Sequence, residues 1–445
     1  MITRPSVLLA LQEAAPAVVP ADTAWMLVAT ALVLLMTPAL AFFYGGLVRS
    51  KNSLNTMMMS FTALGAVGIT WALAGFSLAF AEGNALIGGT ANVLLHGITL
   101  EPSGTIPQLL FLVYQGTFAI ITAALISGAV VERMRFGPYL AFIVLWTLLV
   151  YAPMAHWVWG GGWLMSLGVL DFAGGTVVHI NAGISAAVAA AVLGVRKDYG
   201  RQAILPHNVP FVLLGAGLLW FGWFGFNGGS ALAANELAAL AFANTALAPM
   251  ATLVVWVLLD YFRTGRATAV GAATAIVVGL VAITPAAGFV GPGAALLLGG
   301  IAALPSYFVI VARSRTRLDD SLDVFAGHGV GGITGALLTG VFAAKAWNPA
   351  GSDGLLAGDA SQLATQALGV GAAILYSAAA TFALLKVMGF VTALRAAPKT
   401  EGVGMDVTQH GEEAYTNGEG SILVIPEATP VLVPAPLLNP QTAAR

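Results

Sequence analysis

The chain has 445 residues, of which 58% are hydrophobic and 9% are charged, and its mean hydropathy is +0.87. Soluble domains carry about 25% charged residues, so this composition excludes an ordinary soluble protein and predicts one that crosses a membrane several times. The formal net charge of −2 offers no basic surface for nucleic acid. The sequence contains no cysteine, which excludes disulfides and thiol chemistry.

Apolar stretches recur along the whole chain, each near the ~20 residues that a helix needs to cross a bilayer. We predict an all-α membrane protein whose eleven transmembrane helices lie at residues 24–48, 54–80, 108–131, 138–156, 172–195, 209–227, 240–262, 268–284, 293–312, 322–343 and 363–390.

Basic residues follow every second stretch and set the orientation. The alternate connectors carry almost none, with Lys345 the exception. Basic connectors stay in the cytoplasm, so we predict an inner (plasma) membrane protein with its N-terminus outside and its C-terminus inside. The residues behind this prediction are Arg49, Lys51, Arg133, Arg135, Arg196, Lys197, Arg201, Arg263, Arg266, Arg313, Arg315 and Arg317.

The two ends differ in composition from the apolar middle. Residues 1–21 are expected to form an extracytoplasmic arm or a weak signal segment, because the apolar run at 7–11 is short and is followed by Gln12 and Glu13. Residues 22–390 form the predicted membrane domain. Residues 391–445 form a cytoplasmic tail, which is proline-rich and predicted to be disordered after about residue 420.

The order of the stretches indicates an internal repeat. Five precede the basic connector at Arg196, five follow it, and an eleventh ends the domain. An odd number of helices in each half gives the halves opposite orientation, as in transporters whose binding sites lie between inverted repeats. We therefore predict two inverted five-helix repeats around a central pore, with an additional eleventh helix.

Two histidines lie inside glycine-rich apolar stretches, His179 in one half and His328 in the other. An unpaired polar group in an apolar medium costs about 2–7 kcal/mol, so each needs a partner or a function. Counted at ~1.5 Å per residue, they lie ~10 Å and ~9 Å from opposite faces of a core ~30 Å thick. We predict that they meet in a pore, with one ring donating to the other.

Other interpretations of the histidines remain. A single histidine on an apolar helix is more often a hydrogen-bonded core residue than a functional one. Two histidines at mirror-related depths favour a functional role. Two imidazoles alone make a poor zinc site, and Asp171 and Asp323 lie nearer the membrane faces. The sequence therefore predicts no metal and no cofactor.

Several motifs then resemble one family. The blocks at 155–162, 171–181, 222–230, 284–288 and 323–330 are similar, in this order, to signatures of the ammonium transporters of the Amt/Mep/Rh family. The resemblance covers about residues 22–415. It implies a fold of eleven helices in two inverted halves and a homotrimer with one pore per subunit.

The resemblance also implies a transport route. Phe118, Trp159 and Ser230 match the site that recruits ammonium at the outer vestibule. Phe118 and Phe226 match a stacked phenyl gate, and His179 and His328 match the histidine pair of the lumen. Aromatic ring faces attract a small cation, a hydroxyl accepts its hydrogen bonds, and a hydrophobic constriction excludes hydrated ions.

Further residues match supporting positions of the family. Asp171 is expected to cap its helix by accepting the N–H groups of the following Ala, Gly and Gly, rather than to contact the histidines. Gln115, Asn227 and Thr284 are expected to support the vestibule. Tyr114 stands where many relatives carry phenylalanine, which places an additional hydroxyl at the vestibule.

Desolvation suggests the mechanism. An ammonium ion in a dry pore pays a large Born penalty, whereas ammonia pays little. We expect ammonium to lose its proton at the gate, ammonia to cross the lumen, and the histidines to relay the proton, which makes uptake electrogenic. The alternatives are an ammonium sensor with little flux and a passive ammonia gas channel. A membrane enzyme has the least support, because the sequence offers no metal cluster and no Ser-His-Asp group consistent with the topology.

The tail resembles a conserved cytoplasmic segment of the family over residues 404–415, including Gly404, Met405, Asp406, His410 and Tyr415. It implies regulation by a trimeric PII-type signal-transduction protein. The alternative is an intramolecular strut between subunits. The predicted partners are thus ammonium or ammonia, two further copies of the chain, a PII-type protein and membrane lipids.

Overall fold

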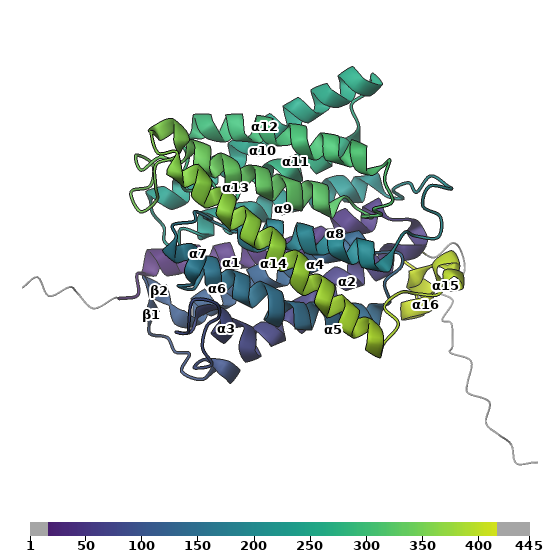
Figure 1. The fold of residues 1–445 in the computed structure, drawn as a ribbon, viewed down its shortest axis with the longest axis horizontal. Coiled ribbons are helices and arrows are strands. Elements are labelled where there is room, and N and C mark those ends of the chain that lie inside the picture. The colour runs from purple at the N-terminus through teal and green to yellow at the C-terminus, as the bar shows by residue number, and fades with distance from the viewer. Residues whose placement is uncertain (1–16, 416–445) are drawn as a thin grey trace, which may run out of the picture.

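The computed structural model describes residues 17–415. Long helices lie side by side along the molecule's longest axis (Figure 1). Helices α15 and α16 lie at one end, and α7, β1 and β2 lie at the other. The predicted N-terminal arm up to residue 16 and the proline-rich end after residue 420 lie outside the described residues.

The first half of the chain forms helices interrupted by short π-helical turns. Such turns often mark functional sites. In order, the elements are α1 (Pro20–Leu47), η1 (Ser50–Asn52), α2 (Ser53–Thr70), η2 (Trp71–Gly75), α3 (Phe76–Phe80), η3 (Val93–Leu95), β1 (Pro102–Ser103), β2 (Ile106–Pro107), α4 (Gln108–Val130), α5 (Phe136–Trp146), η4 (Thr147–Tyr151), α6 (Ala152–Trp159), α7 (Trp163–Ser166), η5 (Gly175–Ile180) and α8 (Asn181–Leu193). The strands β1 and β2 pair antiparallel.

The second half continues with long helices and ends in the tail. Its elements are α9 (Val209–Gly229), α10 (Glu236–Thr264), α11 (Ala269–Ile283), α12 (Pro292–Arg313), η6 (Phe325–Val330), α13 (Gly331–Phe342), η7 (Leu355–Ala357), α14 (Ser361–Val391), α15 (Pro398–Val403) and α16 (Met405–His410).

The predicted spans agree with the observed helices. Within residues 17–415, 10 helical segments are long and apolar enough to cross a membrane, and α11 is a shorter apolar helix. Helices α1 and α10 begin at Pro20 and Glu236, four residues before the predicted spans. Helix α6 continues to Trp159, three residues beyond the predicted end of the fourth span. The ring nitrogens of His156, in α6, lie 2.9 and 2.7 Å from the carbonyl oxygens of Ala79 and Asn84.

The two histidine-bearing segments are built alike. His179 lies in η5 and leads into α8, while His328 lies in η6 and leads into α13. The segments approach closely where Gly183 faces Gly329, since a Cβ at Gly183 would lie 2.1 Å from the Gly329 nitrogen. Small residues permit such close helix contacts in membranes. This contact brings the halves together at the histidines.

Candidate functional site

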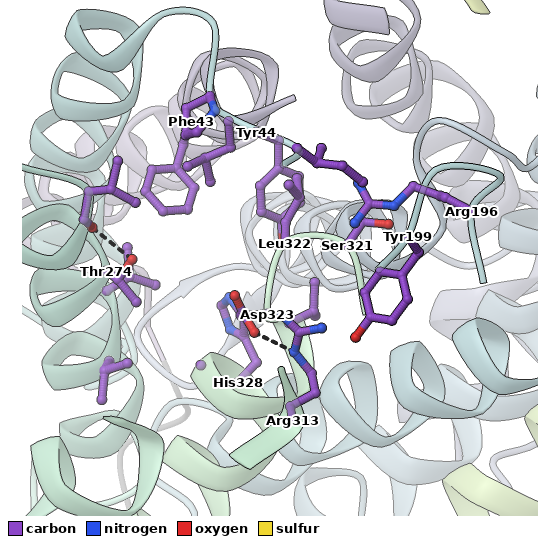
Figure 2. Close-up of a pocket in the computed structure, with 18 of the residues that line it drawn as sticks. Phe43, Tyr44, Arg196, Tyr199, Thr274, Arg313, Ser321, Leu322, Asp323 and His328 are labelled. Carbon is purple, nitrogen blue, oxygen red and sulfur yellow. Dashed lines mark hydrogen bonds and ion pairs between the residues drawn. The ribbon is translucent and has the colours of Figure 1, made fainter. Parts of the chain in front are cut away.

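Three cavities share lining residues with the predicted route. The "aromatic cavity", of about 200 Å³, includes Gln115, Phe118, Trp159 and Ser230 in its wall. The "lumen", of about 10 Å³, contains both histidines. The "tail-side cavity", of about 350 Å³, is lined by residues from α1, from α11 and from the connectors after α8 and α12, and His328 also reaches it (Figure 2).

The aromatic cavity brings together the three residues predicted to recruit a cation. The rings of Phe118 and Trp159 lie 6.1 Å apart at 87°. The Trp159 indole donates to the Asp171 carbonyl oxygen at 2.9 Å, which fixes its ring. The Ser230 hydroxyl donates to the Phe226 carbonyl oxygen at 2.8 Å and lies 3.4 Å from the Tyr114 hydroxyl, so its oxygen keeps a lone pair that can accept from a ligand.

A pair of phenyl rings separates the aromatic cavity from the lumen. Phe118 and Phe226 stack with ring centroids 4.1 Å apart and an interplanar angle of 27°. Both side chains are buried. Phe118 lines the aromatic cavity and Phe226 lines the lumen, so the partition is two rings thick.

The two histidines meet inside the lumen. Their Nδ1 atoms lie 3.2 Å apart, so one Nδ1–H donates to the other nitrogen. Both side chains are buried, and His179 Nε2 has no partner among the described residues. The pair is therefore a hydrogen-bonded unit with a free ring nitrogen in an otherwise apolar passage.

Trp223 is a lumen residue that the sequence did not single out. Its indole stacks on the His179 ring at 5.3 Å and 25°, and its Nε1–H donates to Thr284 Oγ1 at 2.9 Å. Thr284 was predicted to support the vestibule, and it instead supports the lumen through Trp223. The only signal was that Trp223 precedes Phe226 by three residues, which puts both on one face of α9.

Asp171 caps the segment that carries His179. Its Oδ1 accepts from Gly174 and Gly175 at 2.8 and 2.6 Å, and its Oδ2 accepts from Thr176 and Val177 at 2.7 and 3.1 Å. Two of the three predicted donors, Gly174 and Gly175, are confirmed. Thr176 and Val177 donate in place of the predicted Ala173, because the helical turn starts at Gly175. One carboxylate thus satisfies all four of the N–H groups that a helix start leaves open.

Tyr114 is not among the residues that line the aromatic cavity, but its hydroxyl lies 3.4 Å from the hydroxyl of Ser230, which does line it. Tyr114 is fully buried, and its hydroxyl lies 3.1 and 3.0 Å from the carbonyl oxygens of Gly225 and Phe226. It reaches them because Gly229 has no side chain, and a Cβ there would lie 2.7 Å from the hydroxyl. Tyr114 therefore holds the end of α9 behind the gate.

Two residues predicted to support the vestibule, Gln115 and Asn227, lie in different places. Gln115 lines the aromatic cavity, and its Oε1 is buried without a partner among the described residues. Asn227 instead donates to Thr245 Oγ1 at 2.9 Å and joins α9 to α10. It is absent from the walls of the three cavities and supports the vestibule only through the helix frame.

The tail docks on its own chain through exchanged helix caps. Asp406 accepts from the backbone N–H groups of Leu54 and Asn55 at 3.0 and 2.7 Å, so it caps α2. Asn52, the residue before α2, accepts instead from the Met405 N–H at 2.8 Å, at the start of α16. Burial raises the pKa of Asp406 to about 6, although these N–H groups oppose the shift.

The remaining tail residues extend this contact. His410 Nε2 lies 3.1 Å from Asn55 Oδ1, so the ring donates to the amide oxygen. The Tyr415 hydroxyl lies 3.0 Å from His207 Nε2. Gly404 connects the two tail helices with φ of +126°, a conformation that glycine adopts readily.

Buried charged side chains connect the site where the tail docks to the wall of the tail-side cavity. Arg196 lines that cavity and pairs with Glu132 at 2.7 Å and with Asp319 at 2.8 Å. Burial alone would raise the pKa of Glu132, but the guanidinium groups of Arg196 and Arg49 lower it below its usual value. Asn52 also donates to Glu132 at 2.7 Å, so one carboxylate joins both regions.

The motifs and geometry agree with a comparison against protein families. Residues 24–415 match the model of the Ammonium Transporter Family. The chain belongs to this family. An ammonium transporter of Bacillus subtilis is 48% identical over 398 residues, covering 88% of this chain and 98% of that protein. An ammonium transporter of Aquifex aeolicus is 51% identical over 401 residues, covering 88% and 93%.

Solved structures of ammonium transporters share the fold. Saccharomyces cerevisiae Mep2 superposes with a TM-score of 0.83 at 36% identity, covering 91% of this chain and 93% of that one. A structure titled "Sensor Amt Protein" gives 0.82 at 31% identity, covering 88% and 98%. The chain is accordingly a multi-pass membrane protein that functions in ammonium transport, and its family is one of transporters rather than enzymes.

Proposed function

We propose that the aromatic cavity opens to the outside and recruits ammonium. The ring faces of Trp159 and Phe118 provide cation–π attraction, worth about 0.5–2 kcal/mol depending on desolvation. The Ser230 hydroxyl accepts a hydrogen bond from the cation. The positive-inside distribution supports this orientation, because the basic connectors lie on the opposite side.

Ammonium then loses its proton at the Phe118/Phe226 gate, and ammonia enters the lumen. The single observation that carries this proposal is a hydrogen-bonded histidine pair in a lumen of about 10 Å³ behind stacked phenyl rings. Such a space holds about one water molecule, so it cannot keep a hydrated cation. Removing the proton avoids most of the desolvation cost.

The proton follows by way of the histidines, which makes uptake electrogenic. The hydrogen bond between the two Nδ1 atoms provides the relay contact. His179 Nε2 has no partner among the described residues, and its ring lies 6.0 Å from the gate residue Phe226. Imidazole suits this role because it accepts and donates protons near neutral pH.

Currents from purified protein in liposomes test this function. An ammonium pulse should produce an inward current, and an equal potassium pulse should produce none, since potassium cannot shed a proton to enter the lumen. The replacement of exposed His96 by alanine is a control that should leave the current unchanged. A potassium current in the wild-type protein would contradict the mechanism.

The same experiment separates the alternatives. A passive gas channel would raise internal ammonia without any current. A sensor would bind ammonium with little flux of either kind, an alternative kept in view by the structural likeness to a protein titled as a sensor.

We further propose a homotrimer in the inner membrane whose tail serves as a docking segment for a PII-type trimeric protein. The large apolar side chains exposed on α9 and α10, such as Phe221, Phe242 and Met250, provide surface for partner subunits or lipids.

The tail's position beside the tail-side cavity suits a regulator that covers the mouth of this cavity. A pull-down of a PII protein with ADP or 2-oxoglutarate should capture the complex under one condition. Failure to capture the PII protein under every condition would favour the alternative, in which the tail is a strut between subunits.

A further inference from the structure

Leu232 lies in the connector that leaves the end of α9, two residues after Ser230. Its backbone has a φ of +56°. Leucine is disfavoured at positive φ because its Cβ crowds the following carbonyl oxygen, and glycine is the usual residue of this conformation at a helix end. Strained residues persist where the surrounding structure holds them, and they gather at functional sites.

Hydrogen bonds hold the connector on both sides of Leu232. The Leu232 N–H donates to the Gly229 carbonyl oxygen at 2.8 Å, which sets the turn. The Ala234 N–H donates to Asp22 Oδ1, also at 2.8 Å, which ties the connector to α1. The positive φ is therefore enforced by the neighbouring backbone rather than favoured by the leucine side chain.

The side chain of Leu232 lines the aromatic cavity, together with Phe118, Trp159 and Ser230. It is partly buried and packs against the apolar core. An apolar group thus forms part of the cavity wall two residues after the hydroxyl that is proposed to accept from ammonium. A glycine would suit the backbone better and would remove this part of the wall.

We propose that Leu232 excludes water from the ammonium recruitment site and so determines how tightly this site holds the cation. The inference deepens the proposed function and rests on it, because it concerns the same cavity. A cation over an aromatic ring gains more when water is removed from the contact. A hydrogen bond to Ser230 likewise strengthens in a less polar surrounding. The backbone strain is the cost of an apolar side chain at this position.

Ammonium binding to the purified full chain in detergent tests this role. Ammonium that binds only the folded protein raises its unfolding temperature as the concentration increases, and this dependence gives the dissociation constant. Ammonium chloride replaces sodium chloride at constant ionic strength, so that the screening of charges does not change. The readout is binding alone, and it does not depend on the proposed proton relay.

Three substitutions of Leu232 separate the side chain from the backbone. Leu232→Gly and Leu232→Ala both remove the apolar wall and should raise the dissociation constant at least about fivefold. Leu232→Met keeps an apolar side chain of similar volume and should stay within about twofold of the wild-type constant. Without ammonium, Leu232→Gly should unfold at a higher temperature than Leu232→Ala, because only glycine relieves the positive φ.

Leu94→Gly is the matched control. Leu94 also has a positive φ, of +58°, but it lies in η3, is 71% exposed and does not line the aromatic cavity. The dissociation constant of this variant should equal that of the wild type. The control separates loss of the cavity wall from the release of backbone strain elsewhere.

An unchanged dissociation constant in Leu232→Gly would overturn the proposal, as would an equal rise in Leu94→Gly. Ser230→Ala distinguishes this failure from failure of the proposed function. If Ser230→Ala weakens binding and Leu232→Gly does not, the recruitment site stands and only the role of Leu232 is wrong. If neither variant weakens binding, the recruitment site in the aromatic cavity is wrong as well.

Discussion

His179 and His328 share one hydrogen bond between their Nδ1 atoms, 3.2 Å apart, although they are 149 residues apart in the chain. Neither ring can be replaced without affecting the other, because the remaining Nδ1 would stay buried. The pair therefore has consequences for both stability and transport.

The first prediction concerns stability. Replacing one histidine with leucine leaves one buried nitrogen unsatisfied, at a cost of about 1–3 kcal/mol, whereas replacing both removes the unsatisfied group. We expect the unfolding midpoint of the double variant to lie closer to wild type than that of either single variant. Thermal unfolding in detergent measures this. Additive losses in the double variant would show that the two nitrogens do not depend on each other.

The second prediction concerns Thr284. Thr284→Val keeps the shape of the side chain but removes the acceptor for the Trp223 indole, with an expected loss of about 1 kcal/mol. Ammonium flux should fall because Trp223 stacks on His179. Thr334→Val is the control, since the Thr334 hydroxyl only donates to the carbonyl oxygen of Val330 in its own helix. Equal flux in both variants would remove Thr284 from the lumen's support.

The third prediction separates Tyr114 from Ser230. Tyr114→Phe should lower the unfolding midpoint, by about 1 kcal/mol of stability, and leave apparent ammonium affinity unchanged, because the hydroxyl lies closer to two backbone carbonyl oxygens, at 3.1 and 3.0 Å, than to Ser230 Oγ, at 3.4 Å. Ser230→Ala should weaken ammonium affinity. Concentration dependence of the current measures both. Weaker affinity in Tyr114→Phe would place its hydroxyl at the cation site after all.

The fourth prediction concerns the four N–H groups capped by Asp171. Asp171→Asn retains one acceptor oxygen and Asp171→Ala retains none, so stability should fall in the order Asp, Asn, Ala. The first buried N–H group that loses its acceptor should cost about 1–3 kcal/mol of unfolding free energy. Asp359→Asn, at an exposed position, is the control. Equal unfolding midpoints for all three residues at position 171 would exclude the capping role.

The fifth prediction concerns tail docking and pH. Docking raises the pKa of Asp406 to about 6 from about 3.9 in a free chain, so the docked state binds this proton more tightly and docking strengthens as pH falls through 6. Burial lowers the pKa of His410, so its contribution to docking weakens as pH falls. Of the groups facing Asp406, His207 opposes the rise in its pKa and Glu413 adds to it.

His410→Gln removes the opposing titration while keeping a donor for Asn55. In that variant the anisotropy of a dye at exposed Lys399→Cys should rise between pH 7 and pH 5, and the His410 protein should show a flatter profile. A steeper fall with acid in His410→Gln would contradict the assigned sign for Asp406.

The sequence predicted the membrane spans well, because apolar runs of sufficient length depend on local composition alone. The stacking of Phe118 on Phe226 and the contact between the two histidines were predictable from the sequence motifs that contain these residues. Trp223 and the Tyr114 hydroxyl were not, because their partners are set by helix packing that leaves no local pattern. The exchanged caps of α2 and α16 join residues about 350 positions apart, such as Leu54 and Asp406, 352 apart.

If His179 and His328 relay the proton, the current that accompanies ammonium uptake depends on both rings. Currents after an ammonium pulse should be compared in liposomes containing wild-type protein and the folded double variant His179→Leu/His328→Leu. The account predicts an ammonium-specific current in the wild type and its loss in the double variant. An unchanged, ammonium-selective current in the double variant would contradict it.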